Sequence, residues 1–166
     1  MTLRIRGKAL PETSLVMAIV NRTPDSFYDK GLTYELAAAL DRVDQVVAEG
    51  AHIVDIGGVK AAPGEEVPAD EEARRVVELI AAARERHPEV VLSVDTFRAS
   101  VARVAFEAGA DLLNDAWEMP EPETLEVAAE YGAGLVCTHA GHLPPRTRPH
   151  RTVYRDVVDD VVSTLT

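Results

Sequence analysis

One local pattern occurs three times and constrains the fold of this chain more than any other feature. The segments GAHIVDIGG, GADLLNDAW and GAGLVCTHA each begin with Gly-Ala, continue through mainly apolar residues and end in polar ones. Two further apolar runs, LVMAIV and VVLSV, are also followed by a polar residue. Short apolar runs that alternate with helical stretches predict parallel strands joined by helices. We expect the strands at residues 15–20, 52–56, 90–94, 111–113 and 134–137.

The stretches between these runs carry apolar residues at three- and four-residue steps, the spacing of a helix with one buried face. Three of the helices should end at Gly50, Gly109 and Gly132, because glycine is favoured just after a helix. The remaining helix should begin with Asp70 as its N-cap and stop at the His87-Pro88 pair. The chain therefore alternates strand and helix, which is typical of the α/β class.

Polar side chains stand where each predicted strand ends: Asn21, Asp55, Asp95, Asn114 with Asp115, and His139. Each has an ordinary structural explanation when it is considered alone. Asp95 could cap the next helix, and Asn114 could satisfy the backbone of a loop. Parallel α/β proteins, however, build their active sites at the carboxyl ends of the strands. Five such positions together favour a functional site at this end of the sheet.

The overall composition narrows the class of protein. A hydrophobic fraction of 46% in 166 residues suits a globular domain with its own core. The net charge of −11 comes from acidic residues spread along the helical stretches, so nucleic acid is not an expected partner. No apolar run approaches the roughly 18 residues of a membrane span, and the N-terminus lacks a signal-peptide pattern. We expect a cytoplasmic protein with no membrane partner, and Cys137 as a small core residue.

The absence of several well-known sequence motifs argues against several kinds of chemistry. The chain has no GxGxxG or GxxxxGK[ST] segment for a nucleotide, and no HExxH or paired-cysteine spacing for zinc. Hard oxygen donors such as Asn21 and Asp25 could bind Mg²⁺ with the help of a phosphate-bearing ligand. Carboxylates at Asp55 and Asp95 would suit a substrate with several N–H donors, or a transition state that develops positive charge.

Four of the strand-end motifs together resemble a known family. NRTPDSFYDKG, GAHIVDIGG, LSVDT and GADLLND look like the successive motifs of dihydropteroate synthase, in the family's order and at similar intervals, over residues 15–142. The first motif is the most specific of the four. Its matching positions are Asn21, Thr23, Pro24, Asp25, Ser26, Phe27, Asp29 and Gly31.

The resemblance implies a TIM-type (β/α)₈ barrel, of which this chain would hold about five βα units, and a transferase of folate biosynthesis. The family condenses 6-hydroxymethyl-7,8-dihydropterin diphosphate with p-aminobenzoate and releases diphosphate, with Mg²⁺ as cofactor. By resemblance, Asn21 would bind the metal and the diphosphate, within a first loop that also carries Asp25 and Phe27. Asp95 and Asn114 would hydrogen-bond the pterin ring. The resemblance makes Asp95 and Asp55 the candidate catalytic residues, with Asp55 near the pterin methylene.

The sequence departs from the family in the loop after DIGG, called here the second loop (residues 59–66). Where the family usually continues with Glu-Ser-Thr-Arg-Pro-Gly, this chain reads VKAAPG. The family's Thr and Arg help to seat diphosphate and p-aminobenzoate, and alanine supplies neither a hydroxyl nor a guanidinium group. Lys60 could supply a positive charge nearby. The family's later strands are also missing, so we expect residues 1–166 to form one pterin-binding barrel domain that is incomplete at its C-terminus.

The segment HLPPRTRPHR (residues 142–151) is basic and proline-rich within an acidic chain. It is either a solvated loop or an anion contact at the mouth of the barrel, and the sequence leaves both open.

Three functions follow from the resemblance. The first is a dihydropteroate synthase. The second is a non-catalytic homologue that keeps pterin or partner binding, which the VKAAPG loop favours. The third is a pterin-dependent methyltransferase domain, although NRTPDSF matches the synthases better. A homodimer is a possible assembly, because members of the family are commonly dimers.

Overall fold

The computed structural model describes residues 2–23, 35–147 and 152–165. Five parallel strands pair in sequence order in one sheet, and each of the first four is followed by a helix that leads to the next strand. The strands are β3 (Met17–Asn21), β4 (Ile53–Gly57), β5 (Val91–Asp95), β6 (Leu112–Asp115) and β7 (Gly134–Cys137). The helices are α1 (Leu36–Ala48), α2 (Ala69–Arg86), α3 (Ala99–Ala108), α4 (Glu123–Glu130) and α5 (Val157–Leu165). The predicted alternation of parallel strands and helices is confirmed.

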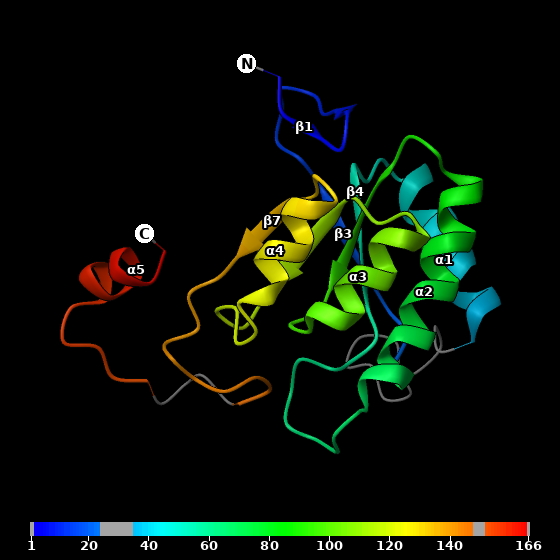
Figure 1. The fold of residues 1–166 in the computed structure, drawn as a ribbon. Coiled ribbons are helices and arrows are strands. Elements are labelled where there is room, and N and C mark those ends of the chain that lie inside the picture. The colour runs from blue at the N-terminus through cyan, green and yellow to red at the C-terminus, as the bar shows by residue number, and fades with distance from the viewer. Residues whose placement is uncertain (1, 24–34, 148–151, 166) are drawn as a thin grey trace.

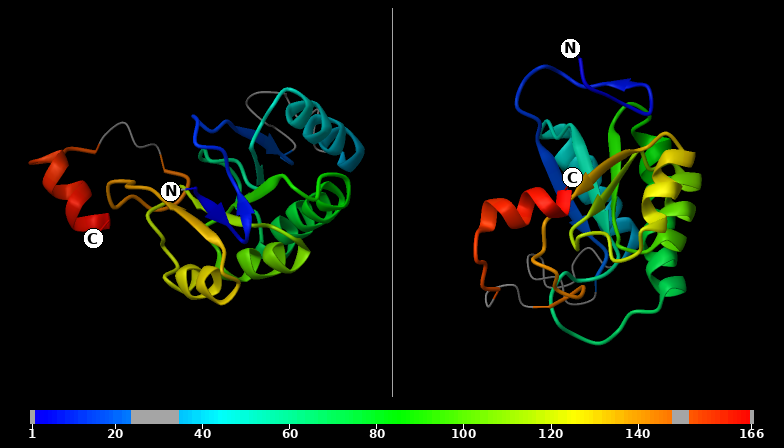
Figure 2. Two further views of the ribbon diagram at one scale, coloured as in Figure 1. Left: turned by 90° about the horizontal axis from the view of Figure 1, so that it is seen from above. Right: turned by 60° about the vertical axis from the view of Figure 1, so that its left-hand side comes forward.

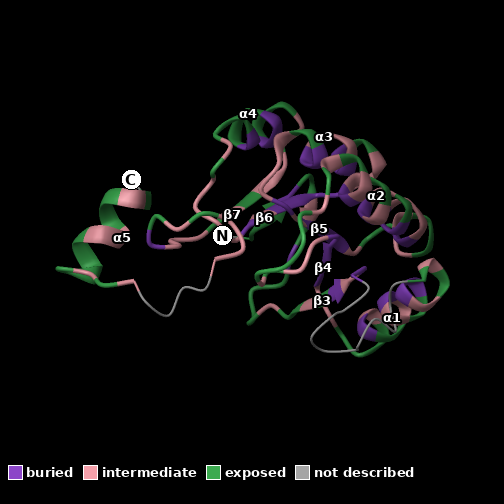
Figure 3. Cartoon of the chain, turned by 90° about the horizontal axis from the view of Figure 1, so that it is seen from below, coloured by how far each residue is buried: buried purple, intermediate pink, exposed green. Residues whose placement is uncertain are grey.

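Helices α1 to α4 form one layer along the outside of the curved sheet (Figures 1 and 2). The main hydrophobic core lies between this layer and the sheet, and it includes Ile56, Leu79, Leu92 and Phe106, none more than 2% exposed. Figure 3 shows the buried residues gathered on the helix faces that turn towards the strands. The helix layer covers the outer face of the sheet. The opposite face, called here the inner face, is left for other contacts.

The inner face is covered at the amino ends of the strands by a short hairpin. Strands β1 (Arg4–Ile5) and β2 (Lys8–Ala9) pair antiparallel, and the turn between them has Arg6 and Gly7 at positive φ. Ile5 of the hairpin and Leu10 pack against residues of the inner face: Ile53, Val91 and Leu112. The sequence analysis did not predict this hairpin, because two-residue strands are too short to show a period of two.

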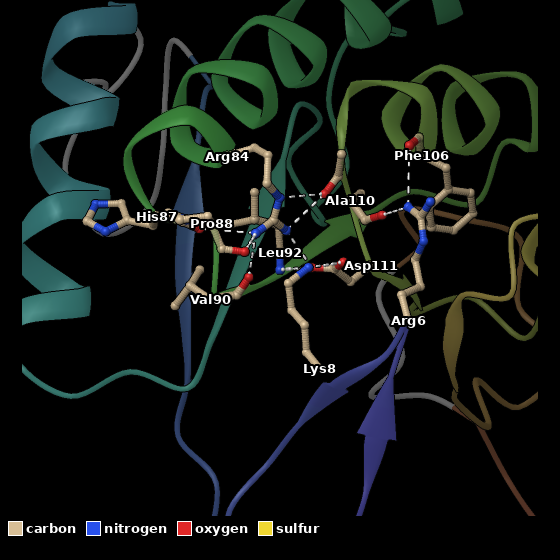
Figure 4. A network of polar contacts seen from close by, with 11 residues as sticks. Arg6, Lys8, Arg84, His87, Pro88, Val90, Leu92, Phe106, Ala110 and Asp111 are labelled. Carbon is tan, nitrogen blue, oxygen red and sulfur yellow. Dashed lines mark hydrogen bonds and ion pairs between the residues drawn. The ribbon is translucent and has the colours of Figure 1, made fainter.

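Buried Asp111, just before β6, joins the hairpin to the body of the protein (Figure 4). Its Oδ1 accepts a bond from Lys8 Nζ at 2.5 Å, and its Oδ2 accepts bonds from Arg84 and from the Leu92 amide. Arg6 of the hairpin donates to the carbonyl of Ala110. A buried carboxylate needs paired charges of this kind. The hairpin therefore closes the amino end of the sheet and leaves the carboxyl end open.

Most of the predicted boundaries agree with the structure, and two local predictions were wrong. Helix α2 has Pro68 as its N-cap, so Asp70 lies inside the first turn. Proline suits this place because its φ is already restricted. Cys137 is exposed, because it belongs to β7, an edge strand of the described sheet. Within the described residues, no helix combines the length and apolar character that crossing a membrane requires.

Candidate functional site

The sheet register brings the predicted strand-end residues into one row. Asn21 on β3 pairs with Gly57 on β4, Gly57 pairs with Asp95 on β5, and Asp95 pairs with Asn114 on β6. These four residues, called here the polar row, lie at the carboxyl ends of four adjacent strands. Asp55 lies two residues before Gly57, and alternate residues of a strand share a face. The row and Asp55 therefore share the inner face, opposite the helix layer.

Gly57 makes room for the first member of the polar row. A Cβ atom added at Gly57 would lie 2.4 Å from Asn21 Oδ1 and 3.5 Å from Asp95 Oδ2. The side chains of Asn21 and Asp95 thus approach the same spot on β4 from its two sides. A residue with any side chain at Gly57 would push them apart. The sequence analysis named Asn21 and Asp95 but missed Gly57, although its place two residues after Asp55 was the available signal.

Asp55 is held rigidly below the row. Ser93 Oγ donates to Asp55 Oδ1 at 2.6 Å, and Asn114 Nδ2 donates to Asp55 Oδ2 at 3.0 Å. Asp55 is only 3% exposed, and this burial raises its pKa, although the two hydrogen bonds oppose the increase. Because the Asn114 amide nitrogen points to Asp55, its amide oxygen is oriented by the same contact. Ser93 was missed by the sequence analysis, and its signal was its position two residues before Asp95.

Asp95 is the ionisable member of the row, and its pKa is strongly raised. Burial, followed by repulsion from Asp55, Glu72 and Asp115, raises its pKa to about 8. The carboxyl group is therefore largely protonated at neutral pH and can donate a hydrogen bond as well as accept one. A strongly shifted carboxyl at the carboxyl end of a parallel sheet is characteristic of functional sites. Asp95 does not cap helix α3, whose N-cap is Arg98.

The other strand-end residues lie away from the row. Asp115 is fully buried on the opposite face of β6, where its Oδ1 accepts a bond from the Trp117 amide at 2.7 Å. His139 follows β7, and its Nε2 contacts Asp160 of α5. Arg22 is buried and donates to Arg75 O and Glu78 Oε2 at 2.9 and 3.1 Å. These residues therefore have structural partners of their own outside the row.

The remaining predicted residues belong to two loops. Asp25 and Phe27 lie outside the described residues, so their predicted roles stay predictions. Lys60 lies in the second loop and lines a pocket that also contains Asp95. The two residues are thus brought to a common pocket, while the role of Lys60 as a source of positive charge stays a prediction.

The oxygen-bearing side chains of the site can be tested against the ligands that Mg²⁺, the metal implied by the resemblance, would need. Across the described ranges, no group of three or more His, Cys, Asp or Glu side chains is placed to hold a metal ion. Mg²⁺ usually keeps several waters and takes only one or two protein ligands together with the phosphates of a substrate. The amide oxygen of Asn21 fits such a role, because it is a hard oxygen donor at one end of the polar row. The structure therefore fits a metal that arrives with a phosphate-bearing ligand better than a permanent metal centre.

Comparisons with known proteins define the class of this fold and site. The family model described as "Pterin binding enzyme" matches residues 17–166. The Mycobacterium tuberculosis (strain H37Rv) protein named "Inactive dihydropteroate synthase 2" is 55% identical over 159 residues, covering 93% of this chain and 50% of that protein. The chain belongs to the dihydropteroate synthase family of pterin-binding enzymes.

Solved structures agree with this assignment. The Yersinia pestis dihydropteroate synthase, solved with a sulfonamide drug complex, has a TM-score of 0.86 and 38% identity, over 98% of this chain and 59% of that chain. The Burkholderia cenocepacia enzyme complexed with 7,8-dihydropteroate has a TM-score of 0.78 and 36% identity, over 99% of this chain and 55% of that chain. This chain spans about half the length of the relatives that it matches. The predicted family and barrel-type α/β fold are confirmed.

Proposed function

We propose that this chain is a non-catalytic dihydropteroate synthase homologue that keeps the pterin-binding row. The observation that carries the proposal is a contrast between two parts of one site. The row of Asn21, Asp95 and Asn114 is assembled by the sheet register, with Asp55 hydrogen-bonded below it. The second loop has Ala61 and Ala62 where the family resemblance implies a hydroxyl and a guanidinium group. The name of the M. tuberculosis relative, an inactive synthase, supports the same reading.

The row offers what a pterin ring requires. A pterin presents several N–H donors and ring acceptors on one flat edge, and the row supplies carboxyl and amide groups that both donate and accept. Asp95 is neutral in the free protein at pH 7, and it would ionise when ring N–H groups donate to it, because such bonds stabilise the carboxylate. Ligand binding near pH 7 should therefore release a proton, and it should tighten as the pH rises towards 8.

The diphosphate of the ligand would lie beside Asn21. When bound there, Mg²⁺ would neutralise part of the diphosphate charge. Asn21 would hold the metal through its amide oxygen, and Asp25 of the first loop would be its second oxygen donor. Gly57 keeps the Asn21 side chain directed along the row towards Asp95. The protein would thus bind the pterin and its diphosphate at neighbouring positions on the inner face.

The synthase reaction is the second candidate, and the position of Asp55 favours it. A buried carboxyl fixed by Ser93 and Asn114 could stabilise positive charge on the pterin methylene as diphosphate departs. The acceptor would then be p-aminobenzoate, placed by Lys60 in the second loop. A methyltransferase would use the same pterin row with a different acceptor. The cytoplasmic location and the homodimer likewise stay predictions.

The test uses the full-length natural protein. Calorimetric titration with 6-hydroxymethyl-7,8-dihydropterin diphosphate and Mg²⁺ should show saturable binding, which Asp95→Ala abolishes and Asp41→Ala, at an exposed site on α1, leaves unchanged. Addition of p-aminobenzoate should then release no diphosphate above the background of protein-free buffer. Release of diphosphate would replace the proposal with the synthase, and transfer to a methyl acceptor would replace it with the methyltransferase. An absence of binding would contradict all three.

A further inference from the structure

Arg146 makes a contact that links two loops far apart in the sequence. Its Nε donates to the carbonyls of Lys60 and Ala62, both at 3.2 Å, and its Nη1 donates to the carbonyl of Glu65 at 2.6 Å. Arg146 lies in the loop after β7, whereas the three carbonyls belong to the second loop, after β4. All three acceptors are main-chain atoms. The contact therefore depends on the path of the second loop and on none of its side chains.

The loop that carries Arg146 is held in an uncommon conformation. Arg146 has a φ of +64° and His142 has a φ of +57°, values that residues other than glycine rarely adopt. His142 is fixed by Glu118, whose Oε2 accepts a bond from the His142 amide at 2.8 Å, and Glu118 itself has a φ of +64°. Such conformations are strained and persist where surrounding contacts enforce them. These backbone conformations accompany the placement of the Arg146 guanidinium against the carbonyls of the second loop.

Arg146 and the second loop enclose the space beside Asp95. Val59, Lys60, Trp117 and Arg146 surround a pocket there of only about 10 Å³. This volume holds about one water molecule, whereas pockets for small organic ligands measure roughly 300–1,000 Å³. The second loop thus occupies the approach to Asp95 from this side.

A larger pocket lies on the other side of the same contact. It measures about 420 Å³, and Thr23, Lys60, Arg75 and Arg146 are among its lining residues. Three carboxylates, Glu65, Glu66 and Glu71, balance its three cations. Long-range attraction of an anion is therefore weak, and recognition would depend on direct contact with a guanidinium group. Arg146 and Lys60 line both pockets and so form the wall between them.

We propose that Arg146 is a positioning residue that fixes the second loop over Asp95 and releases it when a diphosphate-type anion takes the guanidinium. A bidentate bond between arginine and a phosphate is stronger than its bonds to neutral carbonyls, so such an anion competes well for Arg146. Release of the three carbonyls frees the second loop to move off the small pocket. The nature of the natural ligand rests on the proposed function, whereas the loop contact does not.

Proteolysis tests this contact directly, because two of the carbonyls that accept from Arg146 belong to cleavable bonds. Trypsin cleaves after Lys60 and a glutamate-specific protease cleaves after Glu65, and each must reach the carbonyl that Arg146 occupies. Arg146→Ala should accelerate both cleavages roughly fivefold or more, as expected for loss of hydrogen bonds worth about 1 kcal/mol. Arg146→Lys, which keeps a charge but only a point donor, should lie in between. Exposed Arg155, changed to Ala, is the matched control.

Inorganic diphosphate is the probe for release. At millimolar concentration it should accelerate cleavage after Lys60 and Glu65 in the wild-type protein and have no effect on Arg146→Ala. Unchanged cleavage in Arg146→Ala and Arg146→Lys would overturn the proposal, as would an equal effect of diphosphate on all variants. Pterin titration of the same samples separates the two ideas. If diphosphate releases the loop but the pterin does not bind, this inference stands and the proposed function is contradicted. If the pterin binds but diphosphate does not release the loop, the proposed function stands and this inference is contradicted.

Discussion

Asp95 should make the folded protein lose stability as the pH rises. Its carboxyl has a pKa of about 8 in the folded protein, against an ordinary value of 3.8. The folded state therefore binds more protons than the unfolded state between these values, and the free energy of unfolding falls as the pH increases through that range. The favourable contribution of the protonated Asp95 carboxyl to the free energy of unfolding is fully present below about pH 4 and is lost above about pH 8. Asp95→Asn removes this ionisation and should stabilise the protein increasingly across the same interval.

The size of the effect follows from the pKa values. A tenfold change in an equilibrium constant is worth about 1.4 kcal/mol, so the difference between a pKa of about 8 and one of 3.8 sets an upper limit of about 6 kcal/mol at pH 9. Asp95 is half-buried, and water that reaches it lowers this penalty. We expect Asp95→Asn to be about 1–3 kcal/mol more stable than the wild type at pH 8 and nearly equal to it at pH 4.

Urea unfolding curves at several pH values measure this difference. Asp41→Asn, at an exposed position on α1, is the control and should follow the wild type throughout. Asp55 and Asp115 also have raised pKa values, so Asp95→Asn should keep part of the pH dependence. The reasoning would be refuted if Asp95→Asn and the wild type lost stability in parallel between pH 5 and 8.

Three further predictions follow from other contacts. Gly57→Ala should cost about 1–3 kcal/mol and weaken pterin binding tenfold or more, because its Cβ would overlap Asn21 Oδ1; unchanged calorimetric affinity would contradict this. Asp111→Ala should cost about 3–5 kcal/mol in urea unfolding, since it leaves Lys8 and Arg84 without their buried partner; a loss below about 1 kcal/mol would show that the hairpin contact is weak. Pterin affinity should increase from pH 6 to 8 in the wild type, and a decrease would exclude ionisation of Asp95 on binding.

The general fold could be predicted because the strands and helices have clear periodicities. The apolar runs were long enough to identify, and Gly109 and Gly50 adopt the positive φ expected beyond a helix. The sequential order of the strands agrees with the barrel that the family resemblance implies. The hairpin at residues 4–9 could not be predicted in the same way, because its stability comes from Asp111, about a hundred residues later.

The polar row was predicted only in part. Asn21, Asp95 and Asn114 carry polar groups that stand out at strand ends, and their role depends on side chains visible in the sequence. Gly57 contributes by having no side chain, and its importance appears only when the register sets it between two others. Arg146 lies in a basic segment that the sequence left open between solvated loop and anion contact. Its partners are main-chain carbonyls, which no side-chain pattern reveals.

The network around Asp111 also affects the order of events while the chain is being made. Lys8 and Arg6 leave the ribosome early, but their partners Asp111 and Ala110 follow only about a hundred residues later. At roughly 5–20 residues per second, the amino-terminal hairpin waits on the order of ten seconds for its binding surface. During that time the apolar residues Ile5 and Leu10 have an incomplete core, because Ile53 and Val91 emerge before Leu112 and Asp111. Binding of chaperones to nascent chains should therefore decrease once β6 has emerged. The hairpin can complete its contacts with the sheet only after this strand has been synthesised.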